Sequence, residues 1–457
     1  MFIGRKKEKA QLNEQFKSPQ KTAVLVYGKR RIGKSTLIQE AGKEFEGTVI
    51  NHLCAKSSFE GNLELLCRSI MLSLDLPQTL TFATLFDLFD FLKKQDKRIL
   101  LILDEYQYFK ESKKDREVDS MMQAIIDFLP ANIKLVFCGS YISIMKELLE
   151  EENPLFGRFT LVLKLEEFNY LEAAQFAPAL SVREKIKFYS VFGGSPYVLS
   201  NLNYEKTPEE NIKNLLLNEN SLLRTYIENV MIKEIQKAYD IRILQITGNG
   251  KKRFKEIASH LGLSETSLLD KQLKNLLAME TITKTFPINK KNDKKKVFYE
   301  IKDNLMRFYF SFIFANQTLI SKFGTGGFFE KYVKPGLDTF ISLRFENIVN
   351  QYFMLQAQKG KLQETEDFGT YWYDNKEAGT NGQFDCVLKE KDGYAFYEAK
   401  FFKNPMTEHQ CKKEEEQIKQ IPEITPKRVG FVCSAGFDFS GKKYDLISGE
   451  DLYRQSP

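Results

Sequence analysis

The sequence predicts a multidomain α/β protein, and three observations support that prediction. The chain has 457 residues, about three times the usual length of one domain. Short apolar runs alternate with helix-period segments from Lys21 to about Leu163, as in a parallel sheet covered by helices. Beyond that point the pattern changes, first to helices alone and then to helices mixed with paired strands. We therefore expect several domains with separate cores.

Composition excludes several classes of protein. Hydrophobic residues make up 42% of the chain and aromatic residues 13%, enough to fill packed cores, which argues against a disordered chain. Lys and Arg exceed Asp and Glu by only 67 to 61, so any contact with nucleic acid must be local. The 6 Cys residues form no C-x-x-C pair and only 3 His residues occur. Neither a zinc site nor disulfides are expected.

The sequence also lacks the usual features of membrane and exported proteins. Its longest tight apolar cluster, Ile99 to Leu103, is strand-sized, well below the roughly 20 residues that span a bilayer. The opening MFIGRKKEKA contains no apolar signal region. We expect a cytoplasmic protein without a membrane partner.

The first domain is expected over residues 1–169. Its predicted strands are Ala23 to Tyr27, Thr48 to Leu53, Arg98 to Leu103, Lys134 to Cys138 and Leu161 to Leu165. Its predicted helices, where apolar residues recur at helical spacing, are Lys34 to Phe45, Asn62 to Leu74 and Val118 to Phe128. The alternation favours a parallel sheet with helices on its faces.

Two units with other patterns follow. Residues 170–240 predict a helical lid, interrupted by a helix break at Gly193-Gly194-Ser195-Pro196. Residues 241–315 combine short helices with a hairpin whose polar tip lies at Asn289 to Asp293. Ser264 is the expected N-cap of the second of those helices. These parts predict a winged helix-turn-helix.

The loop after the first strand fits the pattern G-x-x-x-x-G-K-[ST], and it lies between the strand AVLVY and the helix STLIQEAGKEF. Glycines there let backbone N–H groups surround a β-phosphate, Lys34 can bridge the β and γ oxygens, and Ser35 can ligate Mg²⁺. The candidate nucleotide contacts of the loop are Gly28, Arg31, Ile32, Gly33, Lys34, Ser35 and Thr36. The sequence thus predicts a P-loop NTPase sheet with ATP and Mg²⁺ as cofactors.

A second chemical element is the apolar strand Ile99 to Leu103, which ends in Asp104 and Glu105. A buried parallel strand would place Asp104 beside the phosphate loop, where the carboxylate can hold Mg²⁺ through water. Glu105 can orient or deprotonate the attacking water. We expect Asp104 to be a metal ligand and Glu105 to be catalytic.

These motifs resemble, in the right order, those of the archaeal-type ATPases of the AAA+/STAND class. The stretches that carry the resemblance cover most of residues 1–315 and are FIGR, YGKRRIGKS, LDEYQ, LVFCGS, the pair GR at 157–158 and FGGSPYVL. The resemblance implies that Ile3 and Arg5 lie near the adenine and that Ser140 senses the γ-phosphate. It further implies that Arg158 is an arginine finger and that Pro196 lies in a lid turn that contacts nucleotide.

Plainer roles exist for three of these residues. Arg158 could be a surface cation, Ser140 could cap a helix, and Pro196 could shape the lid without touching nucleotide. An arginine finger acting in trans would require a homo-oligomer, whereas one acting in cis would not.

Two basic clusters flank the predicted winged unit and could face DNA phosphates. Their members are Lys251, Lys252, Arg253 and Lys255 before the first helix, and Lys290, Lys291, Lys294, Lys295 and Lys296 in the hairpin. Glu265 and Asp270 on the presumed reading helix would repel phosphates. A solvated hairpin tip, or a winged helix used as a rigid spacer or protein contact, therefore stays open beside DNA binding.

Residues 316–457 have an α+β pattern, and two of their strands carry Asp385 and the pair Glu398 and Lys400. The spacing D…E-x-K resembles that of the PD-(D/E)XK nucleases, although no Pro precedes Asp385. Glu398 and Lys400 would share a strand face, so Asp385 and Glu398 are candidate metal ligands and Lys400 a candidate catalytic cation. Glu346, on a predicted helix, would be an accessory acid.

The sequence therefore favours a multidomain α/β protein that binds and hydrolyses ATP with Mg²⁺ and acts on or binds DNA. The restriction-endonuclease-like domain implied by the resemblance could be active or a relic. A slow nucleotide-gated regulator or scaffold and an ATP-gated DNA nuclease are the alternatives.

Overall fold

The structure, a computed structural model, describes residues 2–114, 116–236, 239–263, 267–291, 293–375, 379–419 and 426–454. Ser264, the expected helix N-cap, lies outside these residues. The chain forms two compact units, each described by itself. The first comprises Met1–Glu167 with Ser195–Tyr197, and the second comprises Phe168–Gly194 with Val198–Pro457.

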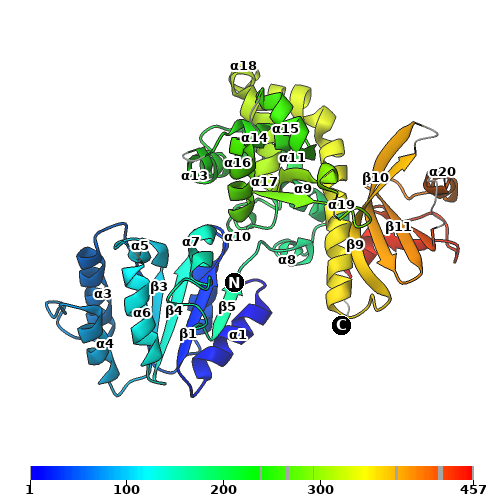
Figure 1. The fold of residues 1–457 in the computed structure, drawn as a ribbon. Helices are drawn as coiled ribbons and strands as arrows, with labels where there is room; N and C mark the ends of the chain where they lie inside the picture. Colours follow the sequence, from blue (N-terminus) through cyan, green and yellow to red (C-terminus); the bar gives the residue numbers. More distant parts are fainter. Residues whose placement is uncertain are drawn as a thin grey trace. The chain divides into compact units, whose positions relative to one another are not determined.

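The first unit is built on a five-stranded parallel sheet with the strand order β2-β3-β4-β1-β5 (Figure 1). Its strands are β1 Thr22–Tyr27, β2 Thr48–Leu53, β3 Ile99–Asp104, β4 Ile133–Gly139 and β5 Leu161–Lys164. Its helices are α1 Lys6–Lys17, α2 Lys34–Gly42, α3 Phe59–Ser73, α4 Leu85–Lys93, α5 Tyr106–Lys110, α6 Glu117–Asp127 and α7 Ile142–Glu147. The predicted fold class, a parallel P-loop sheet within a multidomain α/β protein, is confirmed.

Alternate residues of the central strands face two separate cores, as the period of two in a strand requires. Val24 and Val26 of β1 pack with the buried residues of α1 and α2, whereas Leu25 and Tyr27 pack with those of α3 to α7. Because both faces of the sheet are covered, the central strands are mainly apolar, as predicted; the exception in β4 is the buried Lys134. The carboxyl ends of β1, β3 and β4 meet at one edge, where Tyr27 pairs with Gly139.

The second unit begins with helices. They are α8 Tyr170–Ala174, α9 Val182–Phe192, α10 Pro196–Leu199, α11 Pro208–Ile212, α12 Leu222–Tyr226, α13 Lys233–Gln236 and α14 Arg242–Gly248, and the first two residues of α10 belong to the first unit. A small sheet of order β6-β8-β7 follows. Its elements are β6 Lys252–Arg253, α15 Phe254–Leu261, α16 Ser267–Ala278, β7 Ile282–Thr285 and β8 Phe298–Ile301.

The rest of the second unit contains a five-stranded sheet of order β13-β12-β11-β10-β9. Its elements, with the helices that lead into it, are α17 Asn304–Phe308, α18 Gln317–Phe328, α19 Lys334–Gln358, β9 Thr365–Asn375, β10 Thr380–Glu390, β11 Gly393–Lys400, α20 Glu408–Lys419, β12 Arg428–Cys433, β13 Asp445–Ser448 and α21 Gly449–Tyr453. Helical segments with π geometry are Lys213–Leu217, Ile227–Ile232, Tyr309–Ile313 and Phe329–Val333, and short 3₁₀ turns are Lys294–Lys296 and Phe314–Asn316. Helix α19 runs along this sheet (Figure 1) and contacts it through Phe353 and Tyr397.

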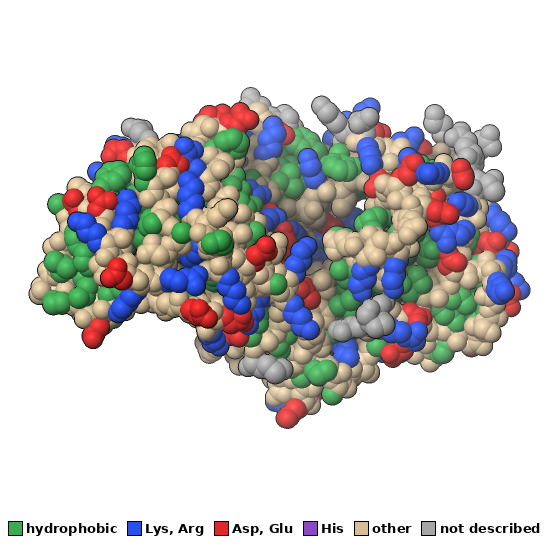
Figure 2. All heavy atoms as spheres, turned by 90° about the horizontal axis from the view of Figure 1, so that it is seen from below, with side chains coloured by type: hydrophobic (Ala, Val, Ile, Leu, Met, Phe, Trp, Pro, Cys, Tyr) green, Lys and Arg blue, Asp and Glu red, His purple; other side chains and the backbone are tan. Residues whose placement is uncertain are grey.

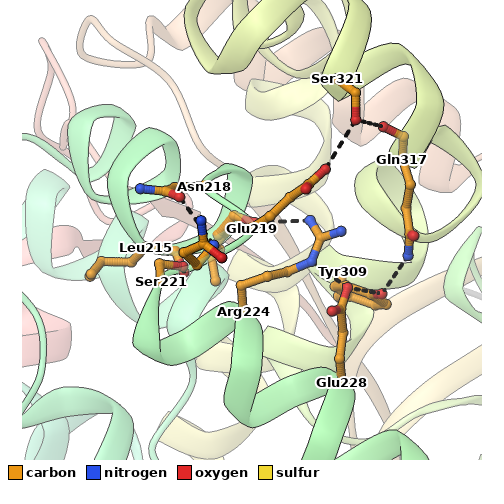
Figure 3. Close-up of polar contacts among 11 residues, drawn as sticks. Leu215, Asn218, Glu219, Ser221, Arg224, Glu228, Tyr309, Gln317 and Ser321 are labelled. Atoms are coloured by element: carbon orange, nitrogen blue, oxygen red, sulfur yellow. Dashed lines mark hydrogen bonds and ion pairs between the residues drawn. The ribbon is translucent and has the colours of Figure 1, made fainter.

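A buried arginine joins the helices before the small sheet to those after it (Figure 3). Arg224 is 2% exposed, donates to the Glu228 carboxylate and to the Leu216 carbonyl, and lies 5.3 Å from the Tyr309 ring centroid. The Tyr309 hydroxyl donates to Glu228 at 2.8 Å and accepts from Gln317 at 3.1 Å. A charge this deeply buried is tolerated only with partners. These helices therefore form one packed block.

The hairpin between β7 and β8 packs against β9, the edge strand of the larger sheet. The Ile288 N–H donates to the Thr370 carbonyl at 2.7 Å, and Asn289 exchanges two hydrogen bonds with the backbone of Trp372. The Trp372 ring stacks on Phe298, with centroids 5.9 Å apart. An open strand edge invites unwanted pairing. The hairpin covers this edge, so the residues at its tip are not wholly solvated, as one of the alternatives from the sequence would require.

Candidate nucleotide-binding and carboxylate sites

The phosphate loop connects β1 to α2, and two glycines fix its path. A Cβ on Gly28 would lie 2.4 Å from the Leu165 carbonyl oxygen, so no side chain fits there. Gly33 has a φ of 89°, in the left-handed region that favours glycine, and it precedes the first turn of α2. The loop thus leads directly into a helix N-terminus, the site where backbone N–H groups and the helix dipole attract phosphate. Ile32 is buried beneath the loop, whereas Arg31 and Thr36 are exposed.

Lys34 lies buried at the start of α2. Its ammonium donates to the carbonyl oxygens of Gly28 and Lys29, each at 2.9 Å. Burial lowers the pKa of Lys34 from its ordinary value, and the nearby Asp104 and Glu105 charges oppose that shift. The cation is therefore held inside the loop, where phosphate oxygens can replace the two carbonyls.

Ser35 and Asp104 form the candidate magnesium site. The Ser35 hydroxyl donates to the Asp104 carboxylate at 2.6 Å, from the first turn of α2 to the end of β3. A hydroxyl and a carboxylate are the oxygen ligands that Mg²⁺ prefers, so this pair fits the ion. A cleft of about 190 Å³ opens beside them, lined also by Gln39, Asn51 and Leu53.

Glu105 occupies the turn after β3 with a φ of 53°, an unfavourable left-handed conformation for this residue type. Its carboxylate accepts from the Ser140 hydroxyl at 2.7 Å and from the Gln107 amide. Gln107 is fully buried. The sequence reasoning missed this partner, although its place in LDEYQ, two residues after the catalytic candidate, could have suggested it. The structure therefore brings Glu105 and Ser140 together.

The predicted nucleotide contact Pro196 lies beside the phosphate loop within the first unit. A Cβ on Gly33 would stand 3.8 Å from the Pro196 Cγ atom. Tyr197, a residue that sequence reasoning did not select, has its ring centroid 4.0 Å from the Arg31 guanidinium carbon. Segment Ser195–Tyr197 thus covers one side of the loop.

For three other predicted residues of the nucleotide site, the structure shows side-chain burial or partners. Arg5 is buried, with its guanidinium donating to the Glu166 carbonyl and to Glu8 at 3.2 Å. Ile3 is half-buried. Arg158 forms an ion pair with Asp127 at 3.2 Å. The expected adenine contacts and the arginine finger stay predictions.

The carboxylates of the second unit lie in two groups. Asp385, at an irregularity in the pairing of β10 with β9, accepts from Lys251 at 2.7 Å and from the Gln383 amide. Glu346 of α19 hydrogen-bonds the same carboxylate. Burial raises the pKa of Glu346 to about 9, and the Asp385 charge adds to that shift. The pKa of Asp385 is shifted the opposite way, below its ordinary value, because its burial is outweighed by the Lys251 ammonium and the hydrogen bonds to its carboxylate.

The second group lies on β11. Lys400 pairs with Glu398 at 2.9 Å and with Glu414 of α20 at 3.2 Å. Burial raises the pKa of Glu398, the Lys400 ammonium opposes this, and the charges of Glu414 and Asp385 add to it. The charge of Asp385 in the first group therefore affects the pKa of Glu398 in the second. Asp385 and Glu398 nevertheless form separate ion pairs, with Lys251 and Lys400. Among the described residues, no three His, Cys, Asp or Glu side chains are arranged to ligate one metal ion.

The basic clusters also have partners within the second unit. Lys251 pairs with Asp385, as described above. Lys291 forms an ion pair with Asp367 at 2.6 Å. The Lys296 ammonium lies 3.8 Å from the Trp372 ring centroid. Lys290 and Lys295 are exposed. Figure 2 shows Lys and Arg mixed with Asp and Glu across the face it draws, so charge of one sign does not dominate that face. In the part of the chain that the structure describes, no helix is both long enough and apolar enough to cross a membrane.

Two family models match the chain. Residues 2–202 match a family described as an ATPase domain predominantly from Archaea. Residues 309–418 match a family of archaeal and bacterial proteins of unknown function. An uncharacterized protein of Methanocaldococcus jannaschii is 28% identical over 387 residues, which span 82% of this chain and 83% of that protein.

Solved structures with a similar fold include a Walker-type ATPase of Pyrococcus abyssi. It has a TM-score of 0.46 and 18% identity, and the match covers 68% of this chain and 96% of that one. The ORC2 protein of Aeropyrum pernix, solved with ADPNP and ADP, has a TM-score of 0.45 and 13% identity. That match covers 70% of this chain and 94% of the ORC2 chain.

Proposed function

Because residues 2–202 carry an ATPase domain of the archaeal type, we propose that the protein binds ATP with Mg²⁺ and hydrolyses it. The observation that carries this proposal is the meeting of Ser35, Asp104 and Glu105 at the end of the phosphate loop. Each of these residues has the chemistry that phosphoryl transfer to water requires at that place.

We assign each residue of the site a separate role in binding or hydrolysis. Lys34 and the N-terminus of α2 bind the phosphates, and Ser35 with Asp104 holds Mg²⁺, which would neutralise charge on the phosphate oxygens. Glu105 orients or deprotonates the attacking water. Ser140 donates to the γ-phosphate, and Arg158 acts as an arginine finger, in cis or from a second copy of the chain.

We also propose that the protein binds duplex DNA through residues 241–301. Helices α15 and α16, followed by the hairpin β7 to β8, match the order of elements in a winged helix-turn-helix. Exposed cations are available on this part of the unit at Lys255, Lys290 and Lys295. Phosphate contacts by a few lysines give weak, salt-dependent binding without sequence preference.

One measurement tests the ATPase and its link to DNA. Phosphate release by the full chain should require Mg²⁺, rise when duplex DNA is added, and be lost in Glu105→Gln. Release that is absent with and without DNA would overturn the ATPase proposal. Release that DNA does not change would favour a regulator or scaffold over a DNA-processing ATPase.

A second candidate function is metal-dependent DNA cleavage by the C-terminal sheet. The observation that favours it is a pair of adjoining charged groups: Asp385 hydrogen-bonds Glu346, and Glu398 pairs with Lys400 at 2.9 Å. The Asp385 charge acts on both Glu346 and Glu398. Once bound, Mg²⁺ or Mn²⁺ would polarise a phosphodiester and activate water. Nicking of plasmid DNA that Asp385→Ala removes, with unchanged thermal unfolding, would support this function, and its absence would leave the domain a relic.

A further inference from the structure

Lys251 reaches from the small sheet into the carboxylates of the larger sheet. It directly precedes β6, and its Nζ atom lies 2.7 Å from Oδ1 of Asp385. The side chains of Lys251 and Asp385 are 22% and 24% exposed. This contact joins residues 134 positions apart in the sequence. It uses a cation from one of the two basic clusters that, from the sequence, could face DNA phosphates.

The position of Lys251 is fixed by a buried ion network. The neighbouring residue Lys252 pairs with Tyr299 of β8, and the next residue of β8, Glu300, is 4% exposed. Glu300 lies 2.6 Å from Arg307 and 3.7 Å from Arg344, a residue of α19. Because buried charges are costly when unpaired, this network holds β8 against α19, the helix that carries Glu346. Strand β6, which Lys251 directly precedes, pairs with β8.

The Asp385 carboxylate has three side-chain partners within the chain. Its Oδ1 atom accepts from Lys251 and from Gln383, and the carboxylate also hydrogen-bonds Glu346. A divalent cation needs the same lone pairs. It would also lie next to the Lys251 ammonium, a like charge at short range.

We propose that Lys251 is a built-in counter-ion that closes the C-terminal carboxylate site, so that a divalent cation binds at Asp385 only after Lys251 withdraws. This inference rests on the second proposed function, the metal site of the C-terminal sheet. Withdrawal requires β6 and the hairpin to loosen from α19 and β9. Any ligand that draws the cations of residues 241–301 away from the sheet, such as DNA phosphates, would open the site.

The test measures Mn²⁺ binding by the full chain without nucleotide, using calorimetry and electron paramagnetic resonance. All proteins carry Asp104→Asn, so that the nucleotide site does not contribute. Lys251→Met should bind Mn²⁺ at least about tenfold more tightly than the parent, because the carboxylate then lacks its counter-ion. Adding Asp385→Asn to Lys251→Met should abolish this gain.

Two variants serve as controls. Lys255→Met removes an exposed lysine of the same region and should leave Mn²⁺ affinity unchanged. Lys251→Arg keeps the charge and should keep the low affinity of the parent, which separates loss of charge from disturbance of the strand. If Lys251→Met does not fold, Lys251→Gln provides the same comparison.

Two outcomes would overturn the inference. Equal Mn²⁺ affinity in the parent and Lys251→Met, abolished by Asp385→Asn, would mean that the metal site exists and Lys251 does not close it. Failure of every variant to bind Mn²⁺ would remove both the closure and the proposed metal site.

Discussion

Ser140 donates its hydroxyl to the Glu105 carboxylate over 2.7 Å, from the end of β4 to the turn after β3. Gln107 donates to the same carboxylate oxygen. Ser140, which we expect to sense the γ-phosphate, is thus hydrogen-bonded to Glu105, which we expect to act on the attacking water. If a bound γ-phosphate attracts Ser140, the carboxylate loses one of its two donors and becomes a better base.

Ser140→Ala removes the proposed hydrogen-bond donor to the γ-phosphate, an interaction that matters most while charge redistributes in the transition state. The substitution should slow ATP hydrolysis more than it weakens ATP binding. We expect kcat to fall about tenfold, equivalent to about 1.4 kcal/mol, with Kd for ATP changed much less. Ser140→Thr keeps the hydroxyl and is the matched control. Steady-state phosphate release and a nucleotide titration measure the two quantities, and an unchanged kcat in Ser140→Ala would contradict the role.

Lys34→Ala and Glu105→Gln should separate binding from hydrolysis. Lys34 contacts ground-state phosphates, so its loss should largely abolish ATP binding. Glu105 acts on water, so Glu105→Gln should keep ATP affinity while hydrolysis falls by about a hundredfold or more. Titration with a fluorescent ATP analogue checks both variants, and equal affinity in wild type and Lys34→Ala would refute the assignment.

The salt dependence of DNA binding should depend on the exposed lysines of the hairpin. Replacing Lys290 and Lys295 with Gln should reduce the slope of log affinity against log salt by about 0.9 for each phosphate that the protein no longer neutralises. Lys291→Gln is the comparison, because Lys291 already pairs with Asp367 and should contribute less. Fluorescence anisotropy over a salt series gives the slopes. A slope unaltered by the double substitution would favour the spacer role.

Asn289→Ala should loosen the hairpin from β9. The substitution removes two hydrogen bonds to the backbone of Trp372, at a cost of about 1 to 3 kcal/mol. Trp372 is the single tryptophan of the chain, so tryptophan emission reports on the surroundings of this residue, where the hairpin packs on β9. We expect red-shifted emission and a lower urea midpoint, with the exposed neighbour Lys290→Ala as control. Emission and midpoint matching the wild type would contradict the packing of the hairpin on β9.

His52 should make the first unit less stable at acidic pH. The side chain is 2% exposed, and burial lowers the pKa of His52 to about 4. The unfolded chain, with a pKa near 6.5, binds more protons between these values, so the free energy of unfolding falls as pH drops from about 6.5 to 4. Between about pH 7 and pH 5 the loss should be about 2 kcal/mol. Urea unfolding at both pH values, compared with His52→Asn, checks this, and an equal loss in the variant would exclude His52 as its source.

The sequence alone was sufficient to predict the five strands and the phosphate loop of the first unit, but it did not predict α1, α4, α5 or α7. Its strands are continuous apolar runs, and its phosphate loop is a local pattern of consecutive residues between a strand and a helix, so neighbours in the chain determine both. Asp104 and Glu105 were also predictable because strand ends in a parallel sheet meet at one edge. The match of residues 2–202 to an archaeal ATPase family agrees with that interpretation.

Tertiary structure alone decided the partners of side chains that are distant in sequence. From the sequence Lys251 was a candidate phosphate contact, and in the structure it pairs with Asp385. Gln107 was not selected from the sequence and donates a hydrogen bond to Glu105. A lysine or a glutamine has the same local propensity whichever partner it meets. Its partner follows from how separate elements pack, and buried charges then select the neighbours that can neutralise them.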